Sequence, residues 1–395
     1  MDFVGEQYYK FNRFFLLCLG LWPDHPYSSL KKIQVIFFET LLISFLLFQF
    51  NAFFLTKRNM DIIIKISMYV VIDIIFIIKY NAYFLLIHYI HYIYDRVKYD
   101  WKILKTQAEL KIIRGYGNNA KLCTISFALI ITISVPIMYI LICVPCILDI
   151  IVPMNESRPR SLPVLLKYFF IDEKVNFHIR AVHIMIVLYV GCMTMVAIAT
   201  LLIAYSLHTC AMFKIASYRM DHIFEENIQR MPKHLKQYVF YEKLIYAVYI
   251  HRRALDLATT LTNSFSTLYF ILVGCGVCSI TLTIFNFFST LSWDNISNST
   301  ILLGIIGVHL YYIIVGNVVG QELIDTSTGI NKSICHTQWY AAPLWMQKSM
   351  LFVMQRSDKR STLTALYLFD ASLEGLATLL SMTMSYVMLL QSVGS

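Results

Sequence analysis

The chain has 395 residues, of which 58% are hydrophobic and 14% are charged, and its mean hydropathy is +0.61. Soluble domains carry roughly 25% charged residues, and a soluble monomer this apolar would expose the large apolar patches that monomers avoid. The composition therefore excludes an ordinary soluble domain and favours a membrane protein. Its formal charge of +9 could suggest a nucleic-acid partner, but the distribution of that charge indicates a membrane orientation instead.

Seven stretches are long and apolar enough to cross a bilayer as a helix, which takes about 20 mostly apolar residues. An open strand in lipid would leave its backbone hydrogen-bonding groups unpaired, so helix is the expected conformation. The stretches are 33–55, 62–87, 122–148, 179–207, 265–288, 301–323 and 363–391. They predict an all-α membrane protein with seven transmembrane helices. Residues 14–22, ahead of them, are too short to cross and lack a signal-peptide cleavage site, so a short amphipathic segment is expected there.

Lysine and arginine are concentrated on one side of this predicted arrangement. Four alternating segments share that side and hold 24 of them, whereas the three segments opposite hold 6. The basic segments are 1–32, 88–121, 208–264 and 324–362. Because positive charge is retained in the cytosol, the N-terminus is expected to be cytosolic and the C-terminus extracellular.

The glycosylation sequons agree with this orientation in part. Three of them, at Asn155, Asn295 and Asn298, lie on the predicted outer side, and a fourth, at Asn331, lies on the inner side. The orientation argues against a G-protein-coupled receptor, whose N-terminus is outside. The predicted outer loops also lack the cysteines that would form the outer disulfide usual in that class.

These observations predict six regions along the chain. They are a cytosolic N-terminus with the amphipathic segment (1–32), a ligand-binding bundle of four helices (33–207), a helical cytosolic region (208–264), two further crossings (265–323), a second cytosolic segment (324–362) and the last helix (363–395). The two cytosolic regions are amphipathic and rich in aromatic residues, so their apolar faces need a partner. That partner is either the same chain or another subunit.

The last predicted helix carries small polar residues on one face. Spacings of three, four and seven residues separate Thr378, Ser381, Ser385 and Ser392. Such residues mediate close helix packing in lipid, or they line a water-filled pore built from copies of the same helix. In the second case Leu389 and Val393, one turn apart at the outer end, would form an apolar constriction that gates by dewetting.

Charged residues within predicted helices also allow two interpretations. Asp73 lies between Lys65 and Lys79 in the second helix, where a structural pair or a snorkelling lysine is favoured over a functional site. Asp370 and Glu374 are four residues apart in the last predicted helix. They would attract cations to an inner vestibule or complement the helix dipole.

Enzymatic chemistry has no support in the sequence. His88 and His91 lack further ligands at metal spacing, and the CxxC pairs beginning at Cys143 and Cys275 lie in apolar helices without nearby histidines. We expect no metal, no cofactor and no enzyme activity.

A ligand site is expected in the outer half of the bundle, where aromatic, aliphatic and thioether side chains suit a small, mostly apolar molecule. The alternative for each residue is contact with lipid or a neighbouring helix. The candidates are Met68, Tyr69, Ile72, Tyr139, Cys143, His183, Ile186, Tyr189, Val190, Met193, Val308, Tyr311 and Tyr312.

Residues 338–393 resemble the C-terminal signature of the insect odorant receptors. The matching residues are Trp339, Tyr340, Pro343, Leu363, Thr364, Ala365, Ser385 and Tyr386. The opening segment, 10–23, is similar to hymenopteran members of that family. Three positions depart from the family pattern: Ser361 and Asp370 stand where proline is usual, and Leu366 stands where glycine is usual.

The resemblance implies an odorant-gated, non-selective cation channel in the plasma membrane of olfactory neuron dendrites. The inner loop after the fourth helix is short, as in the ligand-tuned subunits, which form tetramers with a co-receptor. The implied partners are that co-receptor, a small hydrophobic odorant and membrane lipid, with no nucleic acid and no G protein required. The implied pore and gate residues are Ser381, Ser385, Tyr386, Leu389, Gln391 and Val393; the implied subunit-anchor residues are Trp339, Tyr340, Pro343 and Trp345.

Two other classes stay open. A gustatory receptor of the related family ends its last helix with a tyrosine and a spaced Gln-Phe; here four residues separate Tyr386 from Gln391, and Ser392 replaces the phenylalanine. A metabotropic seven-helix receptor would place its N-terminus outside the cell.

Overall fold

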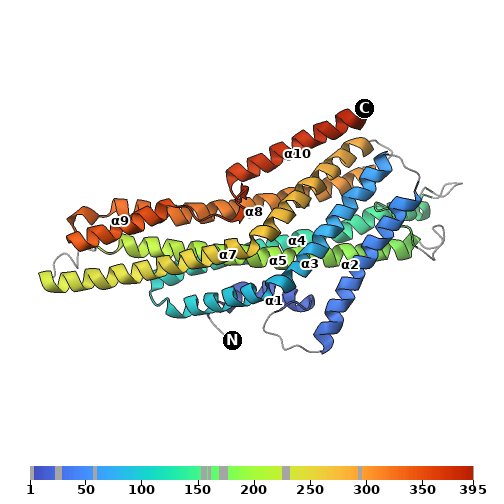
Figure 1. The fold of residues 1–395 in the computed structure, drawn as a ribbon. Coiled ribbons are helices and arrows are strands. Elements are labelled where there is room, and N and C mark those ends of the chain that lie inside the picture. The colour runs from blue at the N-terminus through green and yellow to red at the C-terminus, as the bar shows by residue number, and fades with distance from the viewer. Residues whose placement is uncertain are drawn as a thin grey trace.

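The computed structural model is an elongated bundle of long helices (Figure 1). It describes residues 4–22, 29–56, 60–152, 158, 162–168, 177–224, 232–291 and 296–394. The elements are α1 (Glu6–Cys18), α2 (Ser29–Leu55), α3 (Met60–Ile103), α4 (Gln107–Ile151), α5 (Phe177–Asp221), α7 (Lys233–Thr290), α8 (Ile296–His336), the 3-10 turn η2 (Trp339–Ala341), α9 (Leu344–Asp358), β1 (Thr364–Ala365), β2 (Phe369–Asp370) and α10 (Leu373–Gly394).

Six of the seven predicted crossings fall within six different long helices, in the order α2, α3, α4, α5, α7 and α8, and the seventh overlaps α10. Within the described ranges, six of these are long and apolar enough to cross a membrane by length and composition, and α3 is the seventh. The crossing part of α3 carries the charged residues Lys65, Asp73 and Lys79.

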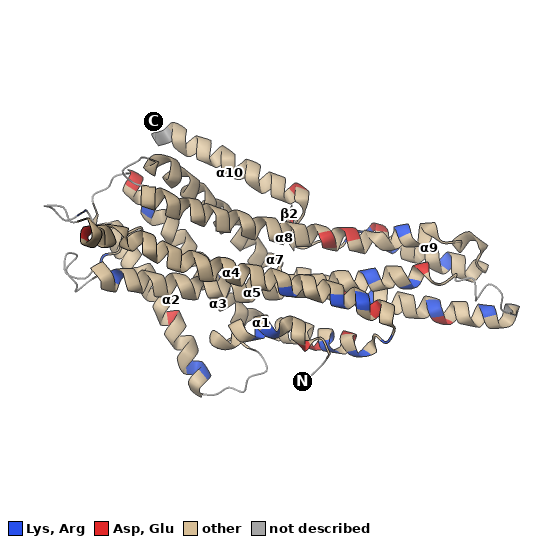
Figure 2. Ribbon diagram, turned by 180° about the vertical axis from the view of Figure 1, so that it is seen from behind, with Lys and Arg blue, Asp and Glu red and all other residues tan. Residues whose placement is uncertain are grey.

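Several helices extend well beyond their apolar stretches. At about 1.5 Å per residue, the 58 residues of α7 span roughly 87 Å, whereas the hydrocarbon core of a bilayer is about 30 Å thick. Figure 2 shows a broad, largely uncharged band across α4, α5, α7, α8 and α10, with charged residues gathered toward the end that carries α9. The charged extensions therefore project from one side of the apolar band.

The N-terminal helix α1 is packed into the bundle rather than lying apart from it. Asn12 is fully buried and donates to Thr200 Oγ1 of α5 at 2.8 Å. Tyr8 stacks on Trp101 with ring centroids 5.5 Å apart, and Leu16 is completely buried. The predicted short amphipathic segment, 14–22, thus lies in α1 only up to Cys18, and the buried face of that helix lies against α4 and α5.

The predicted helix 363–391 is too long at its start, because α10 begins at Leu373. The preceding residues form a two-residue antiparallel pairing of β1 with β2. The turn between them holds Leu366 and Tyr367 at φ of 50° and 60°, a left-handed conformation that favours glycine. Asp370 therefore lies in β2 and does not share a helix with Glu374, so the prediction of an i, i+4 pair was wrong.

This hairpin is tied to α7 by side-chain hydrogen bonds. Thr262 Oγ1 donates to the carbonyl oxygen of Thr362 at 2.7 Å, and Ser266 Oγ accepts from the N–H of Leu366 at 2.8 Å. These bonds hold the connection between α9 and α10 against the body of the bundle.

The last helix contacts the rest of the chain through a single ridge. Residues four apart along α10 are buried against α7 and α8, and most of the remaining helix surface is exposed. The ridge consists of Gly375, Leu379, Thr383 and Val387. Figure 1 shows α10 along the edge of the bundle.

Candidate ligand cavity and pore helix

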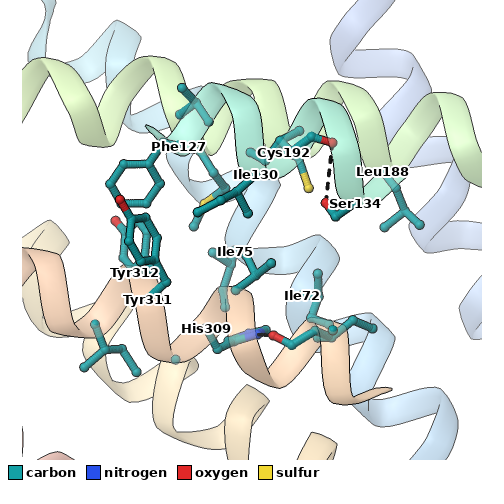
Figure 3. Close-up of a pocket in the computed structure, with 18 of the residues that line it drawn as sticks. Ile72, Ile75, Phe127, Ile130, Ser134, Leu188, Cys192, His309, Tyr311 and Tyr312 are labelled. Carbon is teal, nitrogen blue, oxygen red and sulfur yellow. Dashed lines mark hydrogen bonds between the residues drawn. The ribbon is translucent and has the colours of Figure 1, made fainter. Parts of the chain in front are cut away.

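A cavity of about 680 Å³ lies between α3, α4, α5, α7 and α8. Its walls are mainly isoleucine, leucine, valine and aromatic side chains. Figure 3 shows Phe127, Tyr311 and Tyr312 gathered at one end, with Leu188 and Cys192 toward the other. A volume in the range of about 300–1,000 Å³ with mostly apolar walls is typical of small-molecule sites.

Five of the thirteen predicted ligand residues line this cavity: Tyr69, Ile72, Val308, Tyr311 and Tyr312. The structure places the other eight elsewhere: Met68, Tyr139, Cys143, His183, Ile186, Tyr189, Val190 and Met193. Two of these, Ile186 and Tyr189, are more than 40% exposed on α5. Another, His183, makes a 2.7 Å hydrogen bond through Nδ1 with the hydroxyl of Tyr168.

The α5 wall of the cavity differs from the predicted face. Leu188, Cys192, Met195 and Val196 line it, whereas the prediction chose a set around Ile186 and Val190. The helix α5 is apolar and buried on most of its circumference. Its hydrophobic periodicity therefore does not indicate which of its faces points toward the cavity. On α4, by contrast, Phe127, Ile131 and Ser134 repeat at three and four residues, and that pattern could have indicated the wall.

Two polar groups in the wall are already hydrogen-bonded within the protein. The hydroxyl of Tyr311 lies 2.5 Å from Ser126 Oγ, and its ring centroid lies 4.8 Å from that of Phe127. His309 lies between the backbone oxygen of Ile305, 2.9 Å from Nδ1, and Ser279 Oγ, 2.9 Å from Nε2. With Nδ1 donating to the carbonyl, Nε2 accepts from the serine.

Lys79 is a buried cation at the cavity wall. Its side chain donates a hydrogen bond to the Tyr312 hydroxyl, and Nζ lies 4.5 Å from the centroid of that ring. No carboxylate in the described ranges pairs with it. Both oxygens of Asp73 are buried without a hydrogen-bond partner. The predicted structural pair is therefore not formed, and Lys79, only 2% exposed, does not snorkel.

The α4 wall opens the cavity to the surroundings. Leu129, Ile133 and Ile137 line it and are nevertheless 54%, 56% and 49% exposed. On α8, Gly304 also lines it, and a Cβ added there would meet no atom within 4 Å. The cavity is thus a partly open crevice whose width depends on the absence of a side chain at Gly304.

The cavity also touches the last helix. Leu379 of α10 is part of its wall, and so is Asn317 of α8. Asn317 Oδ1 accepts a hydrogen bond from the N–H of Ser372, directly before α10, at 3.1 Å. The cavity wall is therefore in contact with the start and the first half of α10.

The predicted polar face of α10 is exposed in the single chain. All four residues are exposed: Thr378, Ser381, Ser385 and Ser392. The hydroxyls of Thr378, Ser385 and Ser392 donate to backbone oxygens of α10 itself. In the part of the chain that the structure describes, Thr378, Ser381 and Ser385 thus face away from the other helices. Tyr386, Leu389 and Gln391 are exposed as well. The side chain of Val393 lies outside the described residues.

A second exposed surface lies on the charged extensions. Trp345 of α9 contacts Tyr241 of α7 edge-on at 5.8 Å between ring centroids, and Phe352 beside them is 72% exposed. Of the other predicted anchor residues, Tyr340 is 68% exposed, Trp339 lies in η2, and Pro343 precedes α9. The opposite face of α9 is buried, so its aromatic face is free of the chain's own core.

Only one of the three predicted glycosylation sites can be located. Asn298 is half-buried in the first turn of α8, and its modification stays a prediction. Asn155 and Asn295 lie outside the described residues.

Within the described ranges, seven long apolar helices, five of which enclose a ligand-sized cavity, define an all-α, polytopic membrane protein. A family model described as the 7tm odorant receptor matches residues 59–384, which is most of the chain. The chain belongs to the insect odorant receptor family, as the resemblance of its C-terminal residues predicted.

The similar proteins agree with this assignment. Odorant receptor 9a of Drosophila melanogaster is 21% identical over 196 residues, covering 49% of this chain and 46% of the relative, so the match spans about half of that protein. The olfactory receptor OR5 of Machilis hrabei in complex with eugenol superposes with a TM-score of 0.79 at 10% identity over 98% of both chains. A second structure of OR5 from Machilis hrabei superposes with a TM-score of 0.73 at 11% identity, again over 98% of both chains. The predicted fold class of seven transmembrane helices is confirmed.

Proposed function

We propose that this chain is the ligand-tuned subunit of an odorant-gated, non-selective cation channel in the plasma membrane. The observation that carries the proposal is the contact between the cavity and α10, made by Leu379 in the cavity wall and by the Asn317–Ser372 hydrogen bond. A ligand that fills the cavity changes the position of α10, because α10 and α8 both contribute residues to the cavity wall.

The exposed polar face of α10 supports a pore shared between subunits. The helix α10 has a mean hydropathy of 1.5 and exposes serines on one side. This fits a position in which its apolar face contacts protein or lipid and its serine face contacts water. Several copies of α10 around an axis would line the path for cations. The proposed gate comprises Tyr386, Leu389, Gln391 and Val393, with Ser381 and Ser385 further along the pore.

The exposed aromatic surface on α7 and α9 supports assembly of several subunits. Tyr241, Tyr249, Trp345 and Phe352 lie in one groove together with the basic residues Arg96 and Arg252. Aromatic and arginine side chains are enriched in protein interfaces. The proposed partner is the family's co-receptor, and the proposed topology places this surface in the cytosol, with the N-terminus inside and the C-terminus outside.

The eugenol in the OR5 complex supports a small, mostly apolar odorant as the ligand class for this chain. The dendrite of an olfactory neuron is the proposed location, and no G protein is required for the response.

Voltage-clamp recording from cells that express this chain with the co-receptor, with G-protein signalling blocked, tests the proposal. We expect an inward cation current evoked by a volatile from a broad panel, and an N-terminal tag labelled only after permeabilisation. Labelling of the tag on intact cells would contradict the topology. Absence of current across the panel, with both subunits at the surface, would contradict the channel.

A further inference from the structure

Lys79 gives the cavity a chemical preference that its apolar walls do not. We propose that the ligand is an apolar molecule with a carboxylate or carbonyl oxygen, which binds the Lys79 ammonium and the Tyr312 hydroxyl. This inference rests on the proposed function only in taking the cavity as the ligand site.

The first step is the placement of the ammonium group. Lys79 lines the cavity, is 2% exposed, and uses one hydrogen bond, to the hydroxyl of Tyr312. An ammonium group has three donors and no acceptor. Its remaining donors have no protein acceptor among the residues that the structure describes.

The second step is energetic. An ionised side chain buried away from water is costly unless it is paired and hydrogen-bonded. The ring of Tyr312 offsets part of that cost because Nζ lies 4.5 Å from its centroid. Asp73 does not, because no ion pair joins it to Lys79 and it is not part of the cavity wall. A bound anion or strong acceptor would supply the missing counter-charge.

The third step concerns other polar groups of the wall, which also includes Tyr69 and Tyr269. Tyr311 is engaged with Ser126, and His309 with Ser279 and Ile305. Tyr312 accepts from Lys79, and its own hydroxyl hydrogen is donated to no described residue. Lys79 and Tyr312 therefore present adjacent unused donors at one place, while the neighbouring wall suits a hydrocarbon chain or ring.

The fourth step is the choice between acceptors. Charge-assisted hydrogen bonds are roughly twice as strong as neutral ones, so a carboxylate should bind best, a neutral carbonyl next and a plain hydrocarbon least. A hydrogen bond to a charged group corresponds to about a ten- to hundredfold change in affinity.

Three ten-carbon probes test this order: decanoic acid, 2-decanone and decane. Their affinities are measured as the ligand-induced rise in unfolding temperature of the full chain, purified with its co-receptor, and as current in cells. We expect decanoic acid to bind at least tenfold tighter than decane, with 2-decanone between them. Lys79→Met should abolish the preference and leave decane binding within about threefold. Lys79→Arg should retain the order.

Tyr312→Phe keeps the ring and removes the hydroxyl, so it should reduce the acid preference several-fold even if Lys79→Met does not fold. Wild-type protein that binds the three probes equally would overturn the inference, and so would an unchanged preference in a folded Lys79→Met or Tyr312→Phe variant. A ranked binding order without any current would retain the site and contradict the channel. If the three probes evoke currents in the same order in the wild type and in Lys79→Met, the channel function would be retained and the proposed ligand site contradicted.

Discussion

The side chain of Asn317 in α8 accepts a hydrogen bond from the backbone N–H of Ser372 at the start of α10, at 3.1 Å. Asn317 is 3% exposed and also lines the ligand cavity, and its amide donates to the carbonyl oxygen of Ile313 at 2.8 Å. Ser372 Oγ in turn accepts from the N–H of Gly375 in the first turn of α10. One amide side chain thus joins the cavity wall to the beginning of the proposed pore helix.

Replacement of this amide tests the coupling between cavity and pore. Asn317→Ala removes a buried hydrogen bond of about 1 kcal/mol, so the ligand concentration for half-maximal current should rise about fivefold while ligand binding changes less. Thr328→Ala is a matched control on the same helix, since Thr328 donates only to its own helix. An unchanged current response in a surface-expressed Asn317→Ala receptor would exclude this route of coupling.

The width of the cavity can be tested with a pair of glycines on α8. A side chain at either Gly304 or Gly307 would enter open space, but only Gly304 lines the cavity. Gly304→Leu should therefore weaken binding of a ten-carbon ligand at least tenfold by filling the site, whereas Gly307→Leu should not. Comparable losses of affinity in the two variants would place the ligand outside this cavity.

The hairpin before α10 contains a strained turn. Leu366 has a φ of 50°, which costs a residue with a side chain roughly 1–2 kcal/mol. Leu366→Gly, the family's usual residue, should raise the unfolding temperature of the purified chain by a few degrees. Leu368→Gly provides the control, because Leu368 is 77% exposed and lies outside the positive-φ pair. Equal stabilisation by both substitutions would show that relief of this backbone conformation is not the cause.

The outer end of α10 should control leak through the closed channel. Leu389 is 58% exposed in the single chain, and in the proposed assembly it would face the axis. Leu389→Ala should raise the basal current, because a smaller apolar ring is wetted more easily. Met388→Ala is a neighbouring control at 63% exposure. A basal current that rises only in the Met388 variant would show that Met388, and not Leu389, faces the pore.

The sequence predicts the crossings well because each requires a long apolar run, which few other structures contain. It fails at the start of the last helix, where the apolar residues around Leu366 form a hairpin. That structure depends on hydrogen bonds with Ser266 and Thr262, about a hundred residues away, which no local pattern reveals. The sequence shows that Leu366 stands where glycine is usual, but it does not show that this residue has a positive φ.

The residues of the ligand site were predictable only on helices with a polar side, because the polar side shows which face of the helix points into the bundle. On α3 and α8 the prediction located Tyr69, Ile72, Val308, Tyr311 and Tyr312 in the wall. On α5 it chose the wrong set, since the membrane-crossing part of that helix is mostly apolar and is buried on most sides. The sequence shows Lys79 as an intramembrane charge, but its place in the wall beside Tyr312 depends on a contact between residues 233 positions apart.

Thiol labelling of α10 in the assembled receptor tests most directly whether ligand binding opens a path along this helix. Ser385 is exposed on the proposed pore face, whereas Thr383 is 3% exposed against the bundle. We predict that a charged, water-soluble thiol reagent blocks the ligand-evoked current of Ser385→Cys, faster with ligand present, and spares Thr383→Cys and the wild type. Rapid modification of Thr383→Cys with Ser385→Cys inert would contradict a pore lined by this face.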